Sequence, residues 1–245
     1  MDFYQSISAY YDRIFPMDPK TLSFIDSRAR PGSRILDIAC GTGGYSIALA
    51  ERGHRVTGID LDRAMIRHAR SKARDPDGMA DFRVMDMLSM TADLDPGFGL
   101  VFCIGNSLVH LESDEQIEQL LEDSRSLLGP EGVLILQIIN YDRILAEGLT
   151  GLPTLRDEAA ALEFLRNYEL DPAGRVVIFR TELRVGRGAD QRVIRNQIPL
   201  RIVTSERLTR LVGAAGFRSL ELFGGFDGRP LSLESLPLIL SARRD

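Results

Sequence analysis

The sequence has few of the residues that build disulfide frameworks and zinc sites. Its 245 residues include two cysteines, Cys40 and Cys103, and three histidines, His54, His68 and His110. Two cysteines without framework spacing are typical of a protein from a reducing, intracellular compartment. The three scattered histidines do not have the spacing of a zinc site. We therefore expect no disulfide framework and no bound metal ion.

The sequence also lacks the segments that direct a chain to membranes or nucleic acids. No apolar run approaches the roughly 20 residues that a membrane-spanning helix needs. The first 15 residues are acidic and aromatic and do not resemble a secretory signal. The net charge of −5 is the opposite of the basic footprint of a nucleic-acid-binding domain. These absences predict a cytoplasmic protein that binds neither membranes nor nucleic acids.

What the sequence does contain is an alternation of short apolar runs and amphipathic stretches. Near-continuous apolar strands between helices indicate an α/β fold with a parallel sheet covered on both faces. We predict a doubly wound, mostly parallel, seven-stranded Rossmann-like sheet. Its strands are expected at residues 33–39, 54–59, 81–85, 99–104, 133–139, 217–223 and 236–242, and its helices at 19–30, 43–52, 62–72, 113–128 and 205–215.

The pattern changes after Gly148, where strand-like runs are separated by turn signals at residues 171–174 and 186–188. Such signals are typical of hairpins and not of crossover helices. We therefore expect an inserted antiparallel β meander at residues 151–203, with residues 1–150 and 204–245 forming the main domain. The meander is expected to form either a lid or roof over a substrate pocket or a contact between the subunits of a homodimer.

A glycine-rich turn follows the first predicted strand. Gly41, Gly43 and Gly44 would let a ligand approach the backbone, because glycine has no Cβ. Ser46 stands where the dinucleotide pattern G-x-G-x-x-G has its third glycine, so that pattern is incomplete. Asp60 ends the second strand about 20 residues past the turn, where a carboxylate accepts hydrogen bonds from ribose hydroxyls.

Asp37 lies inside the apolar first strand, where an unpaired charge is costly. A ligand that carries an ammonium and a sulfonium would be a suitable partner, whereas a pyrophosphate would be repelled. This favours S-adenosylmethionine over a nicotinamide dinucleotide as the ligand. A role as a turn cap, or a pairing with a protein Lys or Arg, is the alternative interpretation.

The segment "ILDIACGTGGYSIALAERGHRVTGIDLD", with "DFRVMDM" and "GFGLVFCIGNSLVHL" after it, resembles the successive motifs of class I S-adenosylmethionine-dependent methyltransferases. The resemblance implies that S-adenosylmethionine is the cofactor. It assigns Asp37 to the methionine part, Asp60 to the ribose and Asp86 to the adenine amino group. The remaining contacts that it implies are Ala39, Gly41 and Gly43 beneath the cofactor, Leu61 and Met87 beside the adenine, and Cys103, Ile104, Gly105 and Asn106 near the sulfonium.

The stretches "GNSLVHL" and "NYDRIL" resemble more closely the glycine/sarcosine N-methyltransferase branch and its small-molecule relatives. In that branch an arginine directly before the Asn-Tyr-Asp run binds the carboxylate of the substrate. This sequence has Ile139 there, so the resemblance does not predict glycine as the acceptor. An amino acid acceptor would instead be held by Arg180, Arg195 or Arg201 on the inserted strands.

The acceptor chemistry is predicted from the residues around the ends of the fourth and fifth strands. The fourth strand lacks the Asn/Asp-Pro-Pro-aromatic tetrad used for planar amide or nucleobase nitrogens, and it has no carboxylate cluster for Mg²⁺. The expected partner is therefore a small-molecule methyl acceptor, an amine or a hydroxyl. His110 is the preferred general base, because imidazole ordinarily titrates near neutrality, and Tyr141 and Asp142 are further candidates.

The N-terminal aromatic residues Tyr4, Tyr10 and Tyr11 are expected either to fold over the cofactor as a lid or to pack a first helix. Tyr11 is the one that we place among the catalytic residues, since "YYDRIF" resembles the lid of related enzymes. Two other functions remain open at this point. They are an NAD-dependent oxidoreductase on a related sheet and a non-catalytic regulatory protein that has kept the nucleotide site.

Overall fold

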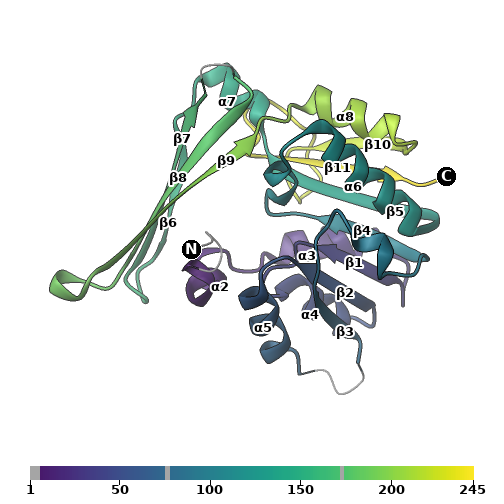
Figure 1. Cartoon of the computed structure of the whole chain (residues 1–245), viewed down its shortest axis with the longest axis horizontal. Helices are drawn as coiled ribbons and strands as arrows, with labels where there is room; N and C mark the ends of the chain where they lie inside the picture. The colour runs from purple at the N-terminus through teal and green to yellow at the C-terminus, as the bar shows by residue number, and fades with distance from the viewer. Residues whose placement is uncertain (1–5, 75–77, 172–173) are drawn as a thin grey trace.

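The computed structural model describes residues 6–74, 78–171 and 174–245 of the chain, so Tyr4 lies outside the described residues. A seven-stranded sheet with the strand order β10-β11-β5-β4-β1-β2-β3 forms the main body (Figure 1). Strands β1 to β5 are parallel, and β11 runs antiparallel to both of its neighbours, β5 and β10. The predicted α/β fold class is confirmed. The strands are β1 (Arg34–Ile38), β2 (Arg55–Asp60), β3 (Ala80–Val84), β4 (Phe98–Cys103), β5 (Leu128–Ile139), β10 (Arg218–Phe223) and β11 (Pro237–Arg243).

Helices cover both faces of this sheet. Alternate residues of each strand point to opposite faces, so Ile35 packs with α3 and α4 while Leu36 packs with α6 and α8. Asp62 and Ser113 cap α5 and α6 through bonds from backbone amides. The longer helices are α3 (Pro19–Asp26), α4 (Gly44–Ala50), α5 (Arg63–Lys72), α6 (Asp114–Leu127), α7 (Tyr141–Glu147) and α8 (Ser205–Ala214), and the short ones are η1 (Ser8–Tyr10), α2 (Tyr11–Ile14), η2 (Met90–Ala92), η3 (Ser107–His110) and η4 (Gly188–Asp190). No helix of the described residues is long and apolar enough to span a membrane.

Two local features depend on residues that are distant in the sequence. The fifth strand starts at Leu128 and not at Val133, because Phe98 pairs with Leu128 before a register shift brings Leu100 opposite Val133. Asp142 does not cap the helix in which it lies. Its side chain accepts the backbone amide of Ser205 at 3.0 Å, at the start of α8, while Asn140 caps α7. Asp142 therefore joins two helices that are distant in the sequence.

The four-stranded antiparallel sheet β6-β7-β8-β9 stands beside the main sheet in Figure 1 and confirms the predicted β meander. We call it the roof sheet. Its inner face packs against the N-terminal segment, where buried Phe164 and Leu183 contact Ile7 and Ile14. Its strands are β6 (Gly151–Asp157), β7 (Leu162–Leu170), β8 (Val176–Val185) and β9 (Arg192–Arg201).

Candidate functional site

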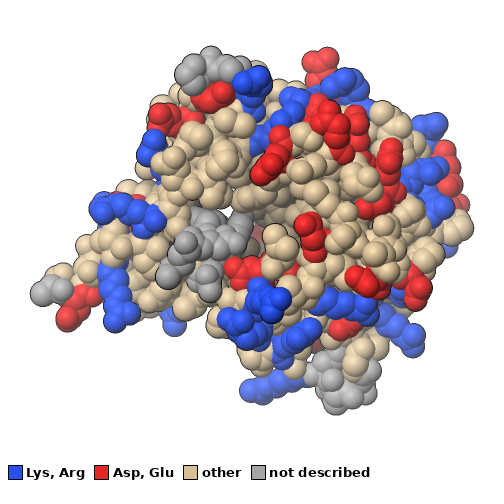
Figure 2. All heavy atoms as spheres, viewed as in Figure 1, with Lys and Arg blue, Asp and Glu red and all other residues tan. Residues whose placement is uncertain are grey.

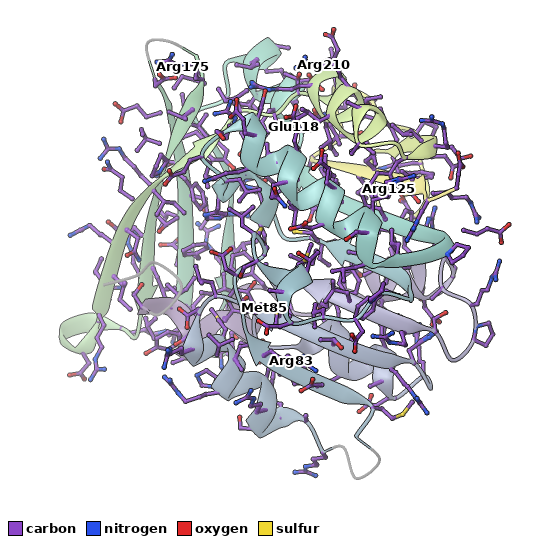
Figure 3. The ribbon with its side chains drawn as sticks, turned by 45° about the vertical axis from the view of Figure 1, so that its right-hand side comes forward. Arg83, Met85, Glu118, Arg125, Arg175 and Arg210 are labelled. Atoms are coloured by element: carbon purple, nitrogen blue, oxygen red, sulfur yellow. The ribbon has the colours of Figure 1, made fainter. Side chains whose placement is uncertain are left out.

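A cavity of about 420 Å³ opens at the carboxyl ends of β1, β2, β3 and β4. The strand order reverses between β1 and β4, and ligands bind at such switch points in open α/β sheets. Figure 3 labels Met85 just beyond β3 and Glu118 on α6 above it, so the elements that flank the cavity can be followed there. The lining residues are Tyr11, Ala39, Gly41, Ile59, Asp60, Leu61, Asp62, Met65, Met85, Asp86, Met87, Leu88, Ser107, His110, Leu111, Glu112 and Gln116.

The turn between β1 and α4 adopts a backbone that depends on glycine. Gly41 and Gly43 have φ values of 56° and 75°, in the left-handed region where side chains are strained. A Cβ on Gly43 would lie 2.6 Å from the Phe82 ring. Ala39 shares the left-handed conformation with a φ of 59°. The turn therefore brings Ala39 and Gly41 to the wall of the cavity.

Asp60 connects the glycine turn to the start of α5. Its Oδ2 accepts the amide of Gly41 at 2.9 Å, and its Oδ1 accepts the amide of Asp62 at 2.8 Å. Asp86 is fixed in a similar way, because its Oδ1 accepts the amide of Leu88 at 2.9 Å. Both carboxylates line the cavity and are held by backbone. They offer oxygen acceptors at the ends of two neighbouring strands.

Asp37 is 3% exposed and accepts a hydrogen bond of 2.6 Å from the Ser46 hydroxyl. Burial raises the pKa of this carboxyl to about 8, against the opposing effect of that hydrogen bond, and the charge of Asp60 adds to the increase. No Lys or Arg among the described residues lies within ion-pair distance of it. The pairing with a protein cation that the sequence left open is therefore absent among the described residues, and the raised pKa keeps the carboxyl protonated near neutral pH in the free protein.

Helix α2 holds the glycine turn, α5 and the roof sheet together. The Tyr11 ring lies against Gly41, 3.2 Å from where a Cβ would be. Asp12 accepts the hydroxyl of Thr42 and the ammonium of Lys72, the latter at 2.7 Å. Arg13 pairs with Asp157 of β6 at 3.3 Å. Tyr11 therefore lies at the glycine turn, and the contacts of Asp12 and Arg13 hold its helix to α5 and to the roof sheet.

We expect Asp12→Ala to release α2 from the glycine turn and to speed the dissociation of a ligand beneath it. Exposed ionic contacts of this kind contribute about 1 kcal/mol, which corresponds to a roughly fivefold faster dissociation. Stopped-flow measurement of S-adenosylhomocysteine release would test this. Arg13→Ala is the matched control, because it removes only the contact with the roof sheet. Equal dissociation rates for wild type and Asp12→Ala would contradict the anchoring role.

The segment after β4 carries the remaining predicted contacts. The Gly105 amide donates to Gln137 at 2.7 Å, and the Asn106 side chain accepts the amide of Ile139 at 2.9 Å. Cys103 is fully buried, and burial raises the pKa of its thiol, with a further increase from Asp37. Residues 103–106 therefore form a rigid end to β4 behind the cavity wall and do not line the cavity itself.

Tyr141 is fully buried at the start of α7 and does not line the cavity. Burial raises the pKa of its phenol, Tyr168 raises it further and Asn106 lowers it, so these three side chains are neighbours. By distance and angle the hydroxyl has no hydrogen-bond partner among the described residues, although Asn106 lies close enough to lower the pKa of the phenol through a hydrogen bond. A buried donor without a partner is unusual in a folded protein.

The structure brings eight of the predicted site residues together around the cavity. They are Tyr11, Ala39, Gly41, Asp60, Leu61, Asp86, Met87 and His110. Asp37, Gly43, Cys103, Ile104, Gly105, Asn106 and Tyr141 lie outside the lining. The sequence reasoning missed Met65, Ser107, Glu112 and Gln116 as lining residues. Of these, Met65 had a signal, because it lies one turn into the helix that follows Asp60.

Comparison with known proteins assigns this chain to a family. A model described as a methyltransferase domain matches residues 35–132. The glycine/sarcosine N-methyltransferase of Aphanothece halophytica is 33% identical over 79% of this chain and 69% of the relative. The chain belongs to the class I S-adenosylmethionine-dependent methyltransferases. The corresponding enzyme of Halorhodospira halochloris is 29% identical over 81% of the chain and 70% of its own length.

Solved methyltransferase structures have the same fold along the whole chain. An S-adenosylmethionine-dependent methyltransferase from Clostridium acetobutylicum matches with a TM-score of 0.81 at 16% identity, covering 99% of both chains. An amino pentose methyltransferase from Micromonospora echinaspora, solved with S-adenosylmethionine bound, matches with a TM-score of 0.73 at 24% identity, covering 100% of this chain and 98% of its own. At these identities the likeness shows the fold alone.

The methyl donor of this methyltransferase is S-adenosylmethionine, and the residues present fit it. Gly41 exposes its backbone to the cavity beside Tyr11, and Gly43 allows the turn to pack against Phe82. Asp37 offers a buried carboxyl without a cation. Asp60 and Asp86 present oxygens to the cavity. A pyrophosphate-containing dinucleotide would place negative charge near Asp37, and the similarity of the chain is to methyltransferases and not to the oxidoreductases that the sequence left open.

The three arginines that the sequence suggested for carboxylate binding are otherwise engaged. Arg180 pairs with Glu169 at 2.8 Å and Arg195 with Glu182 at 2.6 Å, on the outer face of the roof sheet. Arg201 pairs with Asp114 at 3.3 Å. Figure 2 shows Lys/Arg and Asp/Glu side chains intermixed over the roof at the left. The acceptor-binding role of these arginines stays a prediction, which the acidic partner of each and the outward position of Arg180 and Arg195 do not favour.

Proposed function

We propose that this methyltransferase transfers the methyl group of S-adenosylmethionine to the nitrogen of a small-molecule amine. The observation that carries the proposal is the cavity with Asp60 and Asp86 at its rim, beside a buried Asp37, in a chain similar to glycine/sarcosine N-methyltransferases. The Micromonospora neighbour, an amino pentose methyltransferase, also acts on an amine-bearing small molecule by its printed name. A hydroxyl acceptor is the alternative that the test below separates.

The binding roles follow from the chemistry of each side chain. Asp60 would accept hydrogen bonds from the ribose hydroxyls and Asp86 from the adenine amino group, with Leu61 and Met87 against the base. Asp37 would bind the ammonium of the methionine part. When bound, S-adenosylmethionine supplies a methyl group on a positively charged sulfur, which is already a good leaving group. The work of this chain is therefore positioning and exclusion of water.

The residues around the acceptor have supporting roles. His110 lies in the cavity wall and would accept the proton of an ammonium acceptor, so that the nitrogen lone pair faces the methyl group in line with the sulfur. Tyr11 would close the cavity over the cofactor, whereas Tyr141 is buried outside the cavity lining beside Asn106. The roof sheet at residues 151–203 would cover the acceptor. Its ion-paired outer face supports this covering role more than a homodimer contact.

The test is the formation of S-adenosylhomocysteine from S-adenosylmethionine in the presence of primary and secondary amines, aliphatic alcohols and phenols, with mass spectrometry of the products. We expect methylated amines and no methylated alcohols or phenols. A matched assay without acceptor corrects for spontaneous breakdown of the donor. Methylation of hydroxyl acceptors alone would overturn the assignment to nitrogen. Tight S-adenosylhomocysteine binding without transfer to any acceptor would support a non-catalytic role instead.

A further inference from the structure

A polar row crosses the inner face of the roof sheet. Arg166 on β7 is directly opposite Thr181 on β8, and Thr181 is directly opposite Asn196 on β9. Directly opposed residues of antiparallel strands have their side chains on the same face. That face is the inner one, because Phe164 and Leu183, two positions away on the same strands, are both fully buried. Arginine, threonine and asparagine side chains therefore lie next to each other in an apolar surface.

Arg166 differs from the other arginines of the roof sheet. It is the one charged residue among the inward positions of β7 and β8. Its only side-chain hydrogen bond among the described residues runs from Nη2 to the carbonyl of Pro153 at 2.5 Å. Its Nε is buried without a partner, and no carboxylate pairs with it among those residues. Arg180, one residue along in register on the outer face, is paired with Glu169.

Unpaired polar atoms gather around this row. The described residues have six buried side-chain nitrogen or oxygen atoms without a hydrogen-bond partner, and three of them are Arg166 Nε, Thr181 Oγ1 and the Tyr141 hydroxyl. Thr181 is only 4% exposed. Folded proteins leave few such groups unpaired, and those that remain call for an explanation. A polar ligand bound at the row would give partners to Arg166 Nε and Thr181 Oγ1, whereas the Tyr141 hydroxyl already lies beside Asn106.

The row lies between the two places at which the roof sheet meets the cofactor site. On one side, Phe164 packs in the same cluster as Tyr11, which lines the cavity. On the other side, Tyr168 is close enough to Arg166 for the guanidinium to lower the pKa of its buried phenol. Tyr168 in turn adjoins Tyr141, which adjoins Asn106 at the end of β4. A ligand on the row would therefore reach toward the space where the acceptor must sit.

We propose that the Arg166–Thr181–Asn196 row binds an anionic group, a carboxylate or a phosphate, of the methyl acceptor. The inference rests on the proposed function and narrows its substrate class to amines that carry an acidic group. The guanidinium has donors to spare in a fork that matches both anions. The Thr181 hydroxyl supplies a second donor. The Asn196 amide, which donates to Ser6 at 2.9 Å, lies at the far end of the row.

The test compares acceptors of similar length that differ in charge, namely propylamine, 3-aminopropanoate and 2-aminoethyl phosphate. We expect at least one anionic amine to have a kcat/KM tenfold or more above that of propylamine, and the better of the two identifies the anion. In Arg166→Gln this advantage is lost, mainly through a rise in KM, while the affinity for S-adenosylhomocysteine is unchanged. The matched control Arg180→Gln keeps the wild-type preference. An Arg166→Gln enzyme that keeps it as well would overturn the proposal.

Thr181→Val separates recognition from structure, because it removes the unpaired hydroxyl at nearly constant volume. We expect an unchanged or higher Tm together with at least a threefold rise in the KM of the anionic acceptor. A lower Tm with an unchanged KM would indicate a purely structural threonine and contradict the proposal. If Arg166→Gln does not fold, Arg166→Lys replaces it, with a smaller rise in KM expected from the loss of the fork.

Titration of 3-aminopropanoate and inorganic phosphate into the S-adenosylhomocysteine-loaded protein gives a readout without turnover. Binding that is at least tenfold weaker in Arg166→Gln supports the row as an anion site. Equal methylation of neutral and anionic amines would contradict this inference without affecting the proposed function. Binding of S-adenosylhomocysteine without methyl transfer to any amine would contradict the proposed function, and with it the inference about the row.

Discussion

Asp60→Ala is expected to weaken S-adenosylhomocysteine binding by about ten- to a hundredfold. A hydrogen bond to a charged group contributes about 1.5–3 kcal/mol, and each 1.4 kcal/mol is a factor of about ten in affinity. Asp60 would lose its contact with the ribose and also its bonds from the amides of Gly41 and Asp62. The variant therefore loosens the glycine turn that lies beneath the cofactor, and the upper part of the range is expected.

Isothermal calorimetry measures this effect directly. Asp81→Ala is the matched control, because Asp81 is an exposed carboxylate of the neighbouring strand β3 whose partner is Arg83 at 2.6 Å. It should bind S-adenosylhomocysteine as the wild type does. The Tm of both variants has to be recorded, so that a general loss of folding is not read as a binding defect. An Asp60→Ala protein with wild-type affinity and a native Tm would refute the assignment of the ribose site.

The parts of the site that could be predicted from sequence are those that local patterns determine. The apolar run before Gly41 and the run before Asp60 place these residues at strand ends, and parallel strands bring their carboxyl ends to one edge. Glycine at a turn with positive φ needs no tertiary information either. The position of Gly41 and Asp60 at the cavity was therefore accessible from the sequence, whereas Asp37, Gly43 and residues 103–106 were expected there and lie outside the lining.

The residues that bind the acceptor could not be predicted from the sequence, and the arginines of the roof sheet show why. A period of two tells which residues share a face but not which face is turned inward. Arg180 and Arg195 lie on the face that their acidic neighbours share, and both are ion-paired there. The sequence did contain a signal for Arg166, since Leu162, Phe164 and Tyr168 lie at even spacing from it and therefore share its face of the strand. This spacing places Arg166 on the inner face only when the structure has shown which face of the sheet is the inner one.

Long-range pairing accounts for the other differences. Whether residues 129–132 end a helix or continue β5 depends on Phe98 pairing with Leu128, which no local pattern encodes. Asp142 looks like a helix cap in sequence, but its acceptor bond goes to Ser205, 63 positions away. The partner of Asp37 turned out to be Ser46, the residue that breaks the dinucleotide pattern. The residue that departs from that pattern thus holds the buried carboxyl.

Asp37 leads to a second large effect, a dependence of cofactor binding on pH. Its pKa of about 8 in the free protein means that the carboxyl holds a proton at pH 6 and 7. A ligand ammonium favours the ionised form, so binding has to displace that proton. With a free-state pKa of 8, the ionised fraction rises about fiftyfold between pH 6 and pH 8. The affinity for S-adenosylhomocysteine is expected to rise by up to the same factor.

The same shift acts on folding with a definite sign. Between pH 4 and pH 8 the folded protein keeps a proton on Asp37 that the unfolded chain has released, since the usual pKa of the group is 3.8. The unfolded state then binds fewer protons, and the contribution of Asp37 to stability falls as pH rises through this window and is constant above it. A bound ammonium removes this penalty, so the stabilisation by S-adenosylhomocysteine should be largest near pH 8.

Calorimetry at pH 6, 7 and 8, in buffers of different ionisation enthalpy, would count the displaced proton, and about one per ligand is expected at pH 6. Asp37→Asn should bind more weakly than the wild type at pH 8 and with little dependence on pH. Asp123→Asn is the matched control, because Asp123 is a buried carboxyl on α6, bonded to Gln119, that does not line the cavity. An affinity for the wild type that is flat from pH 6 to pH 8 would mean that no ammonium meets Asp37, because a buried carboxyl cannot bind a cation and keep its proton.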